Sequence, residues 1–328
     1  MGSGFKVLVT GAGGFIGSHL VERLVRDGAS VRALVHYNSR NDWGNLELLE
    51  PGVLDSVEVM TGDIADPFAV RAAVKGCAKV FHLSSLIAIP YSYVAPQSYV
   101  TTNVQGAINV LQASREEGVE RVVHTSTSEC YGTAQYVPID ERHPLQGQSP
   151  YSASKIGADM IAESYWRSFG LPVAIIRPFN TFGPRQSARA VIPTVIAQAL
   201  KGGPVKLGSL TPTRDMNYVD NTVEGFLRVA EAPEAIGEVI NCGSGREIAV
   251  GDLARLIIDM VGSRSEIVSD DQRIRPGKSE VERLLACNEK ARSLLGWTPS
   301  VDLEEGLRRT IAWFEKHQAR YKAGIYNV

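Results

Sequence analysis

The chain has 328 residues, of which 44% are hydrophobic and 21% are charged, and its formal net charge at pH 7 is −2. This composition is typical of a folded globular protein, and it offers no basic surface for nucleic acid. No apolar run is long enough to cross a bilayer, and the chain starts without the apolar stretch of a signal peptide, so we expect a cytoplasmic protein. The cysteines are far apart and the histidines lack ligand spacing, which predicts neither disulfides nor a metal site.

Short runs rich in β-branched residues alternate with longer amphipathic segments over the first 180 positions or so. Apolar runs without alternation are typical of strands buried on both faces of a parallel sheet. The sequence therefore predicts an α/β fold, a Rossmann doubly wound parallel sheet with right-handed crossovers. The predicted strands are residues 6–10, 30–35, 57–62, 79–83, 121–126 and 173–178, and the predicted helices lie near 15–27, 67–75, 97–118 and 151–169.

Beyond Pro178 the sequence becomes richer in glycine, proline and threonine, which indicates loops and short strands. One buried run, 238–242, is expected to return to the sheet, and helices are predicted at 251–262 and 302–317. We therefore expect two parts. The larger, Rossmann domain comprises residues 1–178 and about 217–243, and a smaller α/β lobe comprises residues 179–216 and 244–328.

The segment VLVTGAGGFIGSHL follows the first predicted strand and opens a helix. Its glycines Gly11, Gly14 and Gly17 have GxxGxxG spacing, and Ile16 stands where the GxGxxG fingerprint has its last glycine. Glycines at such a turn allow positive φ and let the backbone approach a pyrophosphate at the helix N-terminus. We predict dinucleotide binding here, with Phe15 and Ile16 also at the cofactor; the alternative is a tight turn without a ligand.

The end of the second predicted strand should carry an acidic residue for the adenosine ribose of NAD. Here Val35 is followed by a segment without an acid, HYNSR, so NADP stays open beside NAD. Asp63, after the third strand, is either an adenine contact or the N-cap of the next helix. The remaining predicted cofactor contacts are Asn38, Arg40, Ile64, Leu83, Ser84 and Pro178.

The segment YSASK places Tyr151 and Lys155 four residues apart, on one face of a predicted helix. The ammonium of Lys155 would favour the phenolate and lower the pKa of Tyr151. Tyr151 would then be a base for a hydroxyl that loses hydride to nicotinamide, and Lys155 would also reach the nicotinamide ribose. The alternative is a surface helix with an incidental pair.

Four motifs in this order, TGAGGFIG, HTSTSECYG, YSASK and RPFNTFGPR, resemble those of the extended short-chain dehydrogenase/reductases that act on nucleotide sugars, the NAD-dependent epimerase/dehydratase family. The resemblance covers nearly the whole chain. It implies a tightly bound NAD, catalytic roles for Thr127, Tyr151 and Lys155, and a homodimer formed through helices 97–118 and 151–169. It also implies a GDP- or UDP-linked sugar held by Ser85, Thr127, Asn180, Arg189, Val191, Arg214 and Arg275.

Arginine suits a diphosphate because its planar guanidinium makes forked, charge-assisted hydrogen bonds. The alternative for Arg214 is a surface ion pair with Asp215, and the alternative for Arg275 is a solvated loop charge.

Enzymes of this family oxidise the sugar at C4 and differ in the next step. The sequence Thr127-Ser128-Glu129 resembles the active site of sugar 4,6-dehydratases. The resemblance implies that Glu129 removes the C5 proton and returns one to the leaving C6 hydroxyl, because Ser128 replaces the aspartate that is the acid in one subgroup. Partial burial would raise the pKa of such a carboxylate towards neutrality. The alternative is a solvated charge at a strand end.

Three other functions remain in view. UDP-glucuronate decarboxylases share the Thr-Ser-Glu strand end, but the loop 84–93 carries no charge, which fits a neutral sugar better than a uronate. A C4 epimerase needs no carboxylate at Glu129, and a dinucleotide sensor would typically lack the Tyr151–Lys155 pair. The segment IAIPYSYVAP and its neighbours resemble most closely the GDP-N-acetylglucosamine 4,6-dehydratases of legionaminic-acid-type pathways, which implies an amino sugar.

Overall fold

A seven-stranded parallel sheet forms the centre of the larger domain in the computed structural model, which describes residues 6–322 and Tyr326. The strand order is β10-β6-β5-β4-β1-β2-β3. This order confirms the predicted doubly wound sheet, and the run at 238–242 does return to it beside β6. The strands are β1 (Lys6–Thr10), β2 (Ser30–His36), β3 (Val57–Gly62), β4 (Lys79–His82), β5 (Arg121–Thr125), β6 (Val173–Pro178) and β10 (Val239–Cys242).

Burial differs between the centre and the edge of this sheet. All six residues of β6 are buried, as its unbroken apolar sequence predicts. The expectation of burial on both faces is wrong for β3, which has no fully buried residue because it is the edge strand. Its exposed Glu58 forms ion pairs with Lys6 at 2.6 Å and with Arg32 at 3.0 Å. Charged side chains on an edge strand disfavour pairing with a strand of another molecule.

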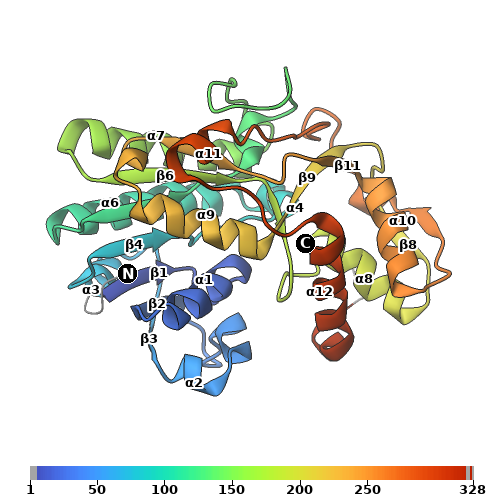
Figure 1. Ribbon diagram of the computed structural model, residues 1–328, viewed down its shortest axis with the longest axis horizontal. Coiled ribbons are helices and arrows are strands. Elements are labelled where there is room, and N and C mark those ends of the chain that lie inside the picture. The colour runs from blue at the N-terminus through green and yellow to red at the C-terminus, as the bar shows by residue number, and fades with distance from the viewer. Residues whose placement is uncertain (1–5, 323–325, 327–328) are drawn as a thin grey trace.

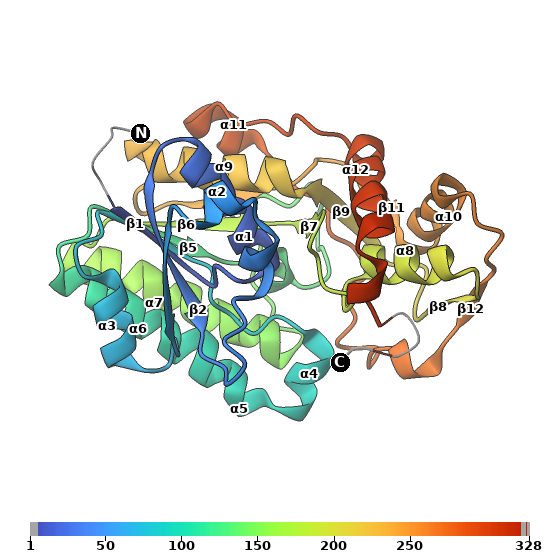
Figure 2. The same ribbon diagram turned by 90° about the horizontal axis from the view of Figure 1, so that it is seen from below.

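Helices cover both faces of the sheet (Figures 1 and 2). One face carries α1 (Phe15–Arg26) and α9 (Val219–Glu231), whose apolar sides belong to one core cluster. The other face carries α3 (Pro67–Val74), α6 (Gly106–Glu116) and α7 (Pro150–Phe169), which belong to a second cluster. The sequence analysis missed α9.

The predicted helix at 97–118 is not continuous. It consists of α5 (Pro96–Tyr99), a π-helical segment (Val100–Gln105) and α6. The wider turn places the buried Asn103 where its amide bonds the Leu86 backbone and the Ser154 hydroxyl of α7. Such π-turns are frequent at functional sites.

The smaller lobe contains two short sheets and the helices that pack on them, at the right of Figure 1. One sheet has the order β11-β9-β7 and the other pairs β12 with β8. The helix α11 (Glu289–Leu295) instead packs against α9 and β10 of the larger domain. The exact lobe boundaries stay a prediction. The lobe's elements are β7 (Asn180–Phe182), β8 (Val205–Leu207), β9 (Thr213–Tyr218), β11 (Glu247–Ala249), β12 (Ile267–Ser269), α8 (Val191–Lys201), α10 (Val250–Val261) and α12 (Leu303–Lys316).

Candidate active site

The glycine turn after β1 is shaped for close backbone approach. Gly11 has φ +68°, and a Cβ on it would lie 2.8 Å from the Ser84 nitrogen. A Cβ on Gly17 would collide with the Gly11 carbonyl oxygen. Gly14 is the N-cap of α1 and provides no side-chain cap, so the first N–H groups of this helix are free to bind an anion. These features fit a dinucleotide pyrophosphate. The first turn of α1 carries the other two predicted contacts, Phe15 and Ile16.

The loop after β2 is held by its own side chains. Asn38 accepts hydrogen bonds from the backbone N–H groups of Arg40 and Asp42, and the Arg40 side chain is exposed. Asp63 is exposed and accepts the N–H of Ala65 at 2.9 Å.

The N-cap of α3 is Asp66, so the N-cap alternative for Asp63 is wrong. The adenine contact of Asp63 stays a prediction, as does that of its buried neighbour Ile64.

A buried hydroxyl at the end of β1 positions the next cofactor-site loop. Thr10 Oγ1 accepts the N–H groups of Leu83 and Ser84 at 3.1 Å each, and it is hydrogen-bonded with His82 Nδ1 at 2.9 Å. This holds the predicted contacts Leu83 and Ser84 beside Gly11. The sequence analysis missed Thr10, although a threonine at a buried strand end directly before the glycine turn was a usable signal. Ser85, a predicted sugar contact, donates to Asn103 Oδ1 at 3.0 Å.

The predicted catalytic pair, Tyr151 and Lys155, lies in the first turns of α7. Ser149 caps this helix in a capping box with Ser152, and Pro150 occupies its first turn, so the start of α7 is well defined. Tyr151 and Lys155 are 7% and 4% exposed, which rules out the alternative of an incidental surface pair.

Lys155 does not act on the phenol as we expected. Its Nζ donates to the Thr125 carbonyl oxygen at 2.6 Å. Burial raises the pKa of Tyr151, the hydrogen bond of Thr127 acts to lower it, and the charge of Glu129 raises it further. The predicted lowering of the tyrosine pKa by Lys155 is therefore wrong for this structure, because desolvation dominates and the ammonium is bonded to the strand end.

The strand end after β5 places Glu129 where its charge acts on Tyr151, the predicted base. Thr127 is the N-cap of a short 3₁₀ turn, and its hydroxyl accepts the Glu129 N–H at 3.3 Å. Ser128 is 2% exposed and Glu129 is 9% exposed. Within residues 6–322, no cation lies at ion-pair distance from the Glu129 carboxylate. The alternative of a solvated strand-end charge does not agree with this burial.

An ionic cluster lies behind Lys155, one helical turn along α7. Asp159 pairs with Arg177 at 2.8 Å and lies 3.3 Å from His124 Nε2. Burial acts to raise the pKa of Asp159, but the contact with His124 and the Arg177 charge hold it well below the usual value. Burial also raises the pKa of the adjacent Cys130 thiol to about 12, so Cys130 packs as a neutral side chain.

The segment after β6 brings an unsatisfied polar group to the site. Pro178 ends β6, and Asn180 begins β7. The Oδ1 atom of Asn180 is buried without a hydrogen-bond partner in the described part of the chain. A buried acceptor without a donor is unfavourable, so a ligand donor at this position would be stabilising.

The remaining predicted contacts of this segment are Arg189 and Val191. Val191 begins α8, and Arg189 is exposed just before it. Burial raises the pKa of Tyr99 to about 12 and the charge of Arg189 acts to lower it. The ring centroids of Tyr99 and Tyr151 are 6.2 Å apart. Arg189 is therefore a cation that acts electrostatically on Tyr99, the residue whose ring lies next to that of Tyr151.

The two arginines predicted for the diphosphate meet at one carboxylate. Glu280 Oε1 lies 3.0 Å from Arg214 Nη2 and 3.3 Å from Arg275 Nη1. The alternative of an Arg214–Asp215 pair is wrong, and Arg275 is partly buried rather than a solvated charge. The sequence analysis missed Glu280. Asp215 instead accepts hydrogen bonds from Ser244, Gly245 and Ala286.

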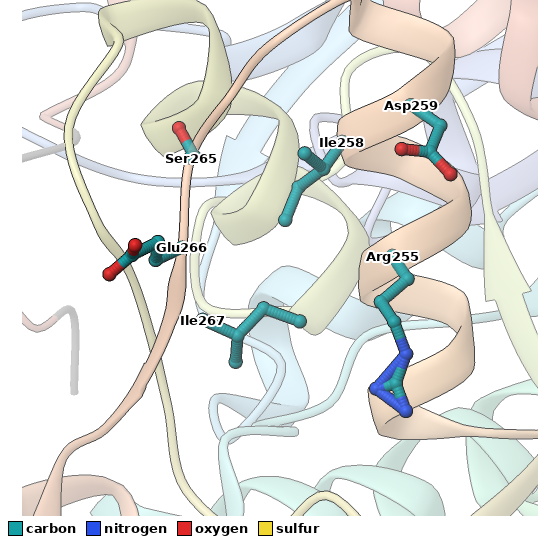
Figure 3. Close-up of a pocket in the computed structure, with 6 residues that line it drawn as sticks. All are labelled: Arg255, Ile258, Asp259, Ser265, Glu266 and Ile267. Carbon is teal, nitrogen blue, oxygen red and sulfur yellow. The ribbon is translucent and has the colours of Figure 1, made fainter.

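A separate hollow lies between α10 and β12 in the smaller lobe (Figure 3). Figure 3 shows Arg255 and Asp259 on the helix side, and none of the lining residues belongs to the site described above. The hollow is lined by Arg255, Ile258, Asp259, Ser265, Glu266 and Ile267.

Within residues 6–322, no three histidine, cysteine or acidic side chains are grouped to hold a metal. No helix in the same range has the length and apolarity needed to span a bilayer.

The fold and site together define a dinucleotide-binding protein of the short-chain dehydrogenase/reductase class, with a Tyr151–Lys155 pair at the carboxyl ends of the strands. Residues 8–310 match the family described as GDP-mannose 4,6 dehydratase, and the chain belongs to that family. This agrees with the resemblance seen in the sequence, whereas the closer likeness to enzymes of legionaminic-acid-type pathways stays a prediction.

Relatives with different reactions are about equally similar to this chain. A putative UDP-glucose 4-epimerase of Methanocaldococcus jannaschii is 32% identical over 95% of this chain and 99% of its own. The dTDP-D-glucose 4,6-dehydratase of Mus musculus is 32% identical over 97% of this chain and 90% of its own. The structure of DesIV, a dTDP-glucose 4,6-dehydratase from Streptomyces venezuelae with NAD and TYD bound, has a TM-score of 0.87 at 30% identity and covers 97% of this chain and 99% of its own. Overall similarity therefore does not separate dehydration from epimerisation.

Proposed function

We propose that this chain is an NAD-dependent nucleotide-sugar 4,6-dehydratase. The observation that carries the proposal is Glu129, a carboxylate that is 9% exposed and whose charge acts on Tyr151. An epimerase that only oxidises and reduces C4 needs no second proton-transferring group there. A carboxylate at this position, with no cation paired to it among the described residues, is available to take a proton from carbon.

NAD, when bound, would supply a hydride acceptor for the oxidation at C4 and a hydride donor for C6. The residues that would hold NAD are those of the glycine turn, the loop held by Thr10, and Lys155. NAD fits better than NADP because a relative of the same fold binds NAD.

The chain's own residues move the protons. Tyr151, in its phenolate form, accepts the proton of the C4 hydroxyl, which Thr127 also contacts, as C4 becomes a ketone. The C5 proton is then α to a carbonyl, and Glu129 removes it. Glu129 gives a proton to the C6 hydroxyl, which leaves as water, and a solvent-derived proton returns to C5 as Tyr151 releases its own. The product is a 4-keto-6-deoxy sugar, lighter than the substrate by one water.

The substrate proposed is a GDP- or UDP-linked hexose or N-acetylhexosamine. Arg214 and Arg275 are available to its diphosphate, and the unpaired Oδ1 of Asn180 to a donor group. The segment 84–93 is not a loop throughout, because its second half lies in the helix α4 (Ile89–Val94). It presents serine hydroxyls and aromatic rings without a charge, which suits a neutral sugar.

One observation favours a second candidate, UDP-glucuronate decarboxylase. Arg189 is an exposed cation near Tyr99, and a uronate carboxylate in the sugar pocket calls for such a group. The decarboxylase shares the C4 oxidation step but loses carbon dioxide from C5 instead of water. The experiment below separates the two reactions.

We also propose a homodimer through α6 and α7. Met160 and Phe169 of α7 are 46% and 49% exposed, and Val100, just before α6, is 55% exposed. Large apolar side chains in water favour a covering partner. Static light scattering at a mass of one chain would contradict this proposal.

The reaction is tested by mass spectrometry of the protein incubated in heavy water. The substrates are GDP-N-acetylglucosamine, UDP-N-acetylglucosamine, dTDP-glucose and UDP-glucuronate. A product that has lost water and carries one deuterium at C5 supports the proposal and identifies the nucleotide. Loss of carbon dioxide from UDP-glucuronate would establish the decarboxylase, and a product of unchanged mass and inverted C4 would establish an epimerase.

A further inference from the structure

The two arginines of the smaller lobe share a single carboxylate oxygen. Arg214 comes from β9, whereas Arg275 and Glu280 come from the loop that precedes α11. Both guanidinium groups donate to Glu280 Oε1, at 3.0 Å and 3.3 Å. The side chains of Arg214 and Glu280 are 8% and 13% exposed, so this contact is largely shielded from solvent. It is therefore a stronger constraint than a surface ion pair.

The backbone of Glu280 is fixed from the larger domain. Gln148 Nε2 donates to the carbonyl oxygens of Glu280 at 3.0 Å and of Lys278 at 3.2 Å. Ser279 Oγ lies 2.7 Å from the hydroxyl of Tyr93, which belongs to the uncharged segment 84–93. The position of the carboxylate is thus set by residues of both the larger domain and the lobe.

Two guanidinium groups held close together repel each other unless an anion lies between them. Glu280 supplies that anion, and the three charges sum to +1. Each guanidinium has five N–H donors. Among the described residues, Arg275 uses one of its donors and Arg214 uses two, the second of which bonds the Thr213 carbonyl oxygen. Most donors of the pair therefore stay free for a second anion.

We propose that Glu280 is a positioning residue that holds Arg214 and Arg275 together as one preformed site for the diphosphate of the nucleotide sugar. This inference rests on the proposed function, because it takes the two arginines as the diphosphate contacts. Glu280 touches neither the reacting atoms nor the cofactor in this arrangement, and it acts through the arginines.

A competing role gives the opposite result. If Glu280 were an internal anion that the diphosphate has to displace, removing its charge would strengthen nucleotide binding. The two roles can therefore be separated by the sign of the effect.

The test is calorimetric binding of GDP, UDP and dTDP to the full chain and to Glu280→Ala and Glu280→Gln. The matched control is Glu282→Gln, which changes an exposed glutamate two residues away without a paired cation in the described chain. For the nucleotide that binds best, we expect Glu280→Ala to weaken binding by about tenfold, which is about 1.4 kcal/mol. Glu280→Gln keeps an acceptor oxygen and should lose less, and Glu282→Gln should match the unchanged protein.

A steady-state measurement separates positioning from general loss of structure. Glu280→Ala should raise KM for the nucleotide sugar by a similar factor and leave kcat within about twofold, because the arginines bind ground state and transition state alike. Unchanged or tighter nucleotide binding in both Glu280 variants, with Arg214→Gln still weakening it, overturns this inference alone. Absence of binding by any nucleoside diphosphate to the unchanged protein overturns both this inference and the proposed substrate class.

Discussion

Replacing Glu129 by glutamine separates the two halves of the proposed reaction. Glutamine has nearly the same shape, and the Glu129 carboxylate has no paired cation in the described chain, so the free energy of unfolding should change by no more than about 1 kcal/mol. The amide cannot take the C5 proton. Loss of a positioned general base costs roughly 10²–10⁴-fold in rate, so water loss should slow by that factor.

The first half of the reaction should respond in the other direction. The charge of Glu129 contributes to raising the pKa of Tyr151, so its removal lowers that pKa. A larger fraction of Tyr151 is then ionised at a given pH, and formation of reduced cofactor should shift to lower pH rather than slow down. Glu129→Gln is therefore expected to accumulate reduced cofactor and the 4-keto sugar.

The assay is a single turnover followed by nicotinamide absorbance. The reaction is then quenched, and the mass of the sugar product is determined by mass spectrometry. Glu120→Gln is the matched control, because Glu120 is an exposed glutamate just before β5 whereas Glu129 follows the end of that strand. Dehydration at the unchanged rate in Glu129→Gln would remove Glu129 from the mechanism. Failure to reduce the cofactor in a folded Glu129→Gln protein would refute the separation into two halves.

Three further predictions concern the same site. Tyr151→Phe should slow cofactor reduction roughly 10²–10⁴-fold while nucleotide binding is kept, and unchanged reduction would contradict its role as the base. Gly11→Ala should lose bound NAD and about 1–3 kcal/mol of unfolding free energy, because φ is +68° and the new Cβ would lie 2.8 Å from the Ser84 nitrogen; cofactor content and denaturant unfolding check this. The free energy of unfolding should fall above about pH 10, because burial raises the pKa of Tyr99 and of Tyr131 to about 12 in the folded protein. A phenol whose pKa is raised on folding stabilises the folded state fully below its unfolded pKa of 10.0. That contribution is lost as the pH rises through 12. Denaturation midpoints that do not decrease over this alkaline range would contradict the burial of these phenols.

The sequence by itself determined the parts of this protein that depend on local periodicity. Continuous apolar runs place strands at 6–10 and 173–178 with the observed bounds, because a strand buried on both faces cannot tolerate polar alternation. The glycine turn and the Tyr151–Lys155 pair are likewise short-range patterns, and the structure brings both to the carboxyl ends of the sheet. The chemistry that these two motifs predict therefore depends on residues within a few positions of each other in the sequence.

Only the tertiary structure decided which groups meet across long stretches of chain. Glu280 contacts Arg214 at a separation of 66 residues, and Thr10 holds Ser84 at a separation of 74. The ammonium of Lys155 is bonded to Thr125, 30 residues away, which periodicity on one helix face could not indicate. Periodicity tells which side of an element is buried, whereas partners, pKa directions and edge exposure depend on which elements pack together and on how much solvent that packing removes.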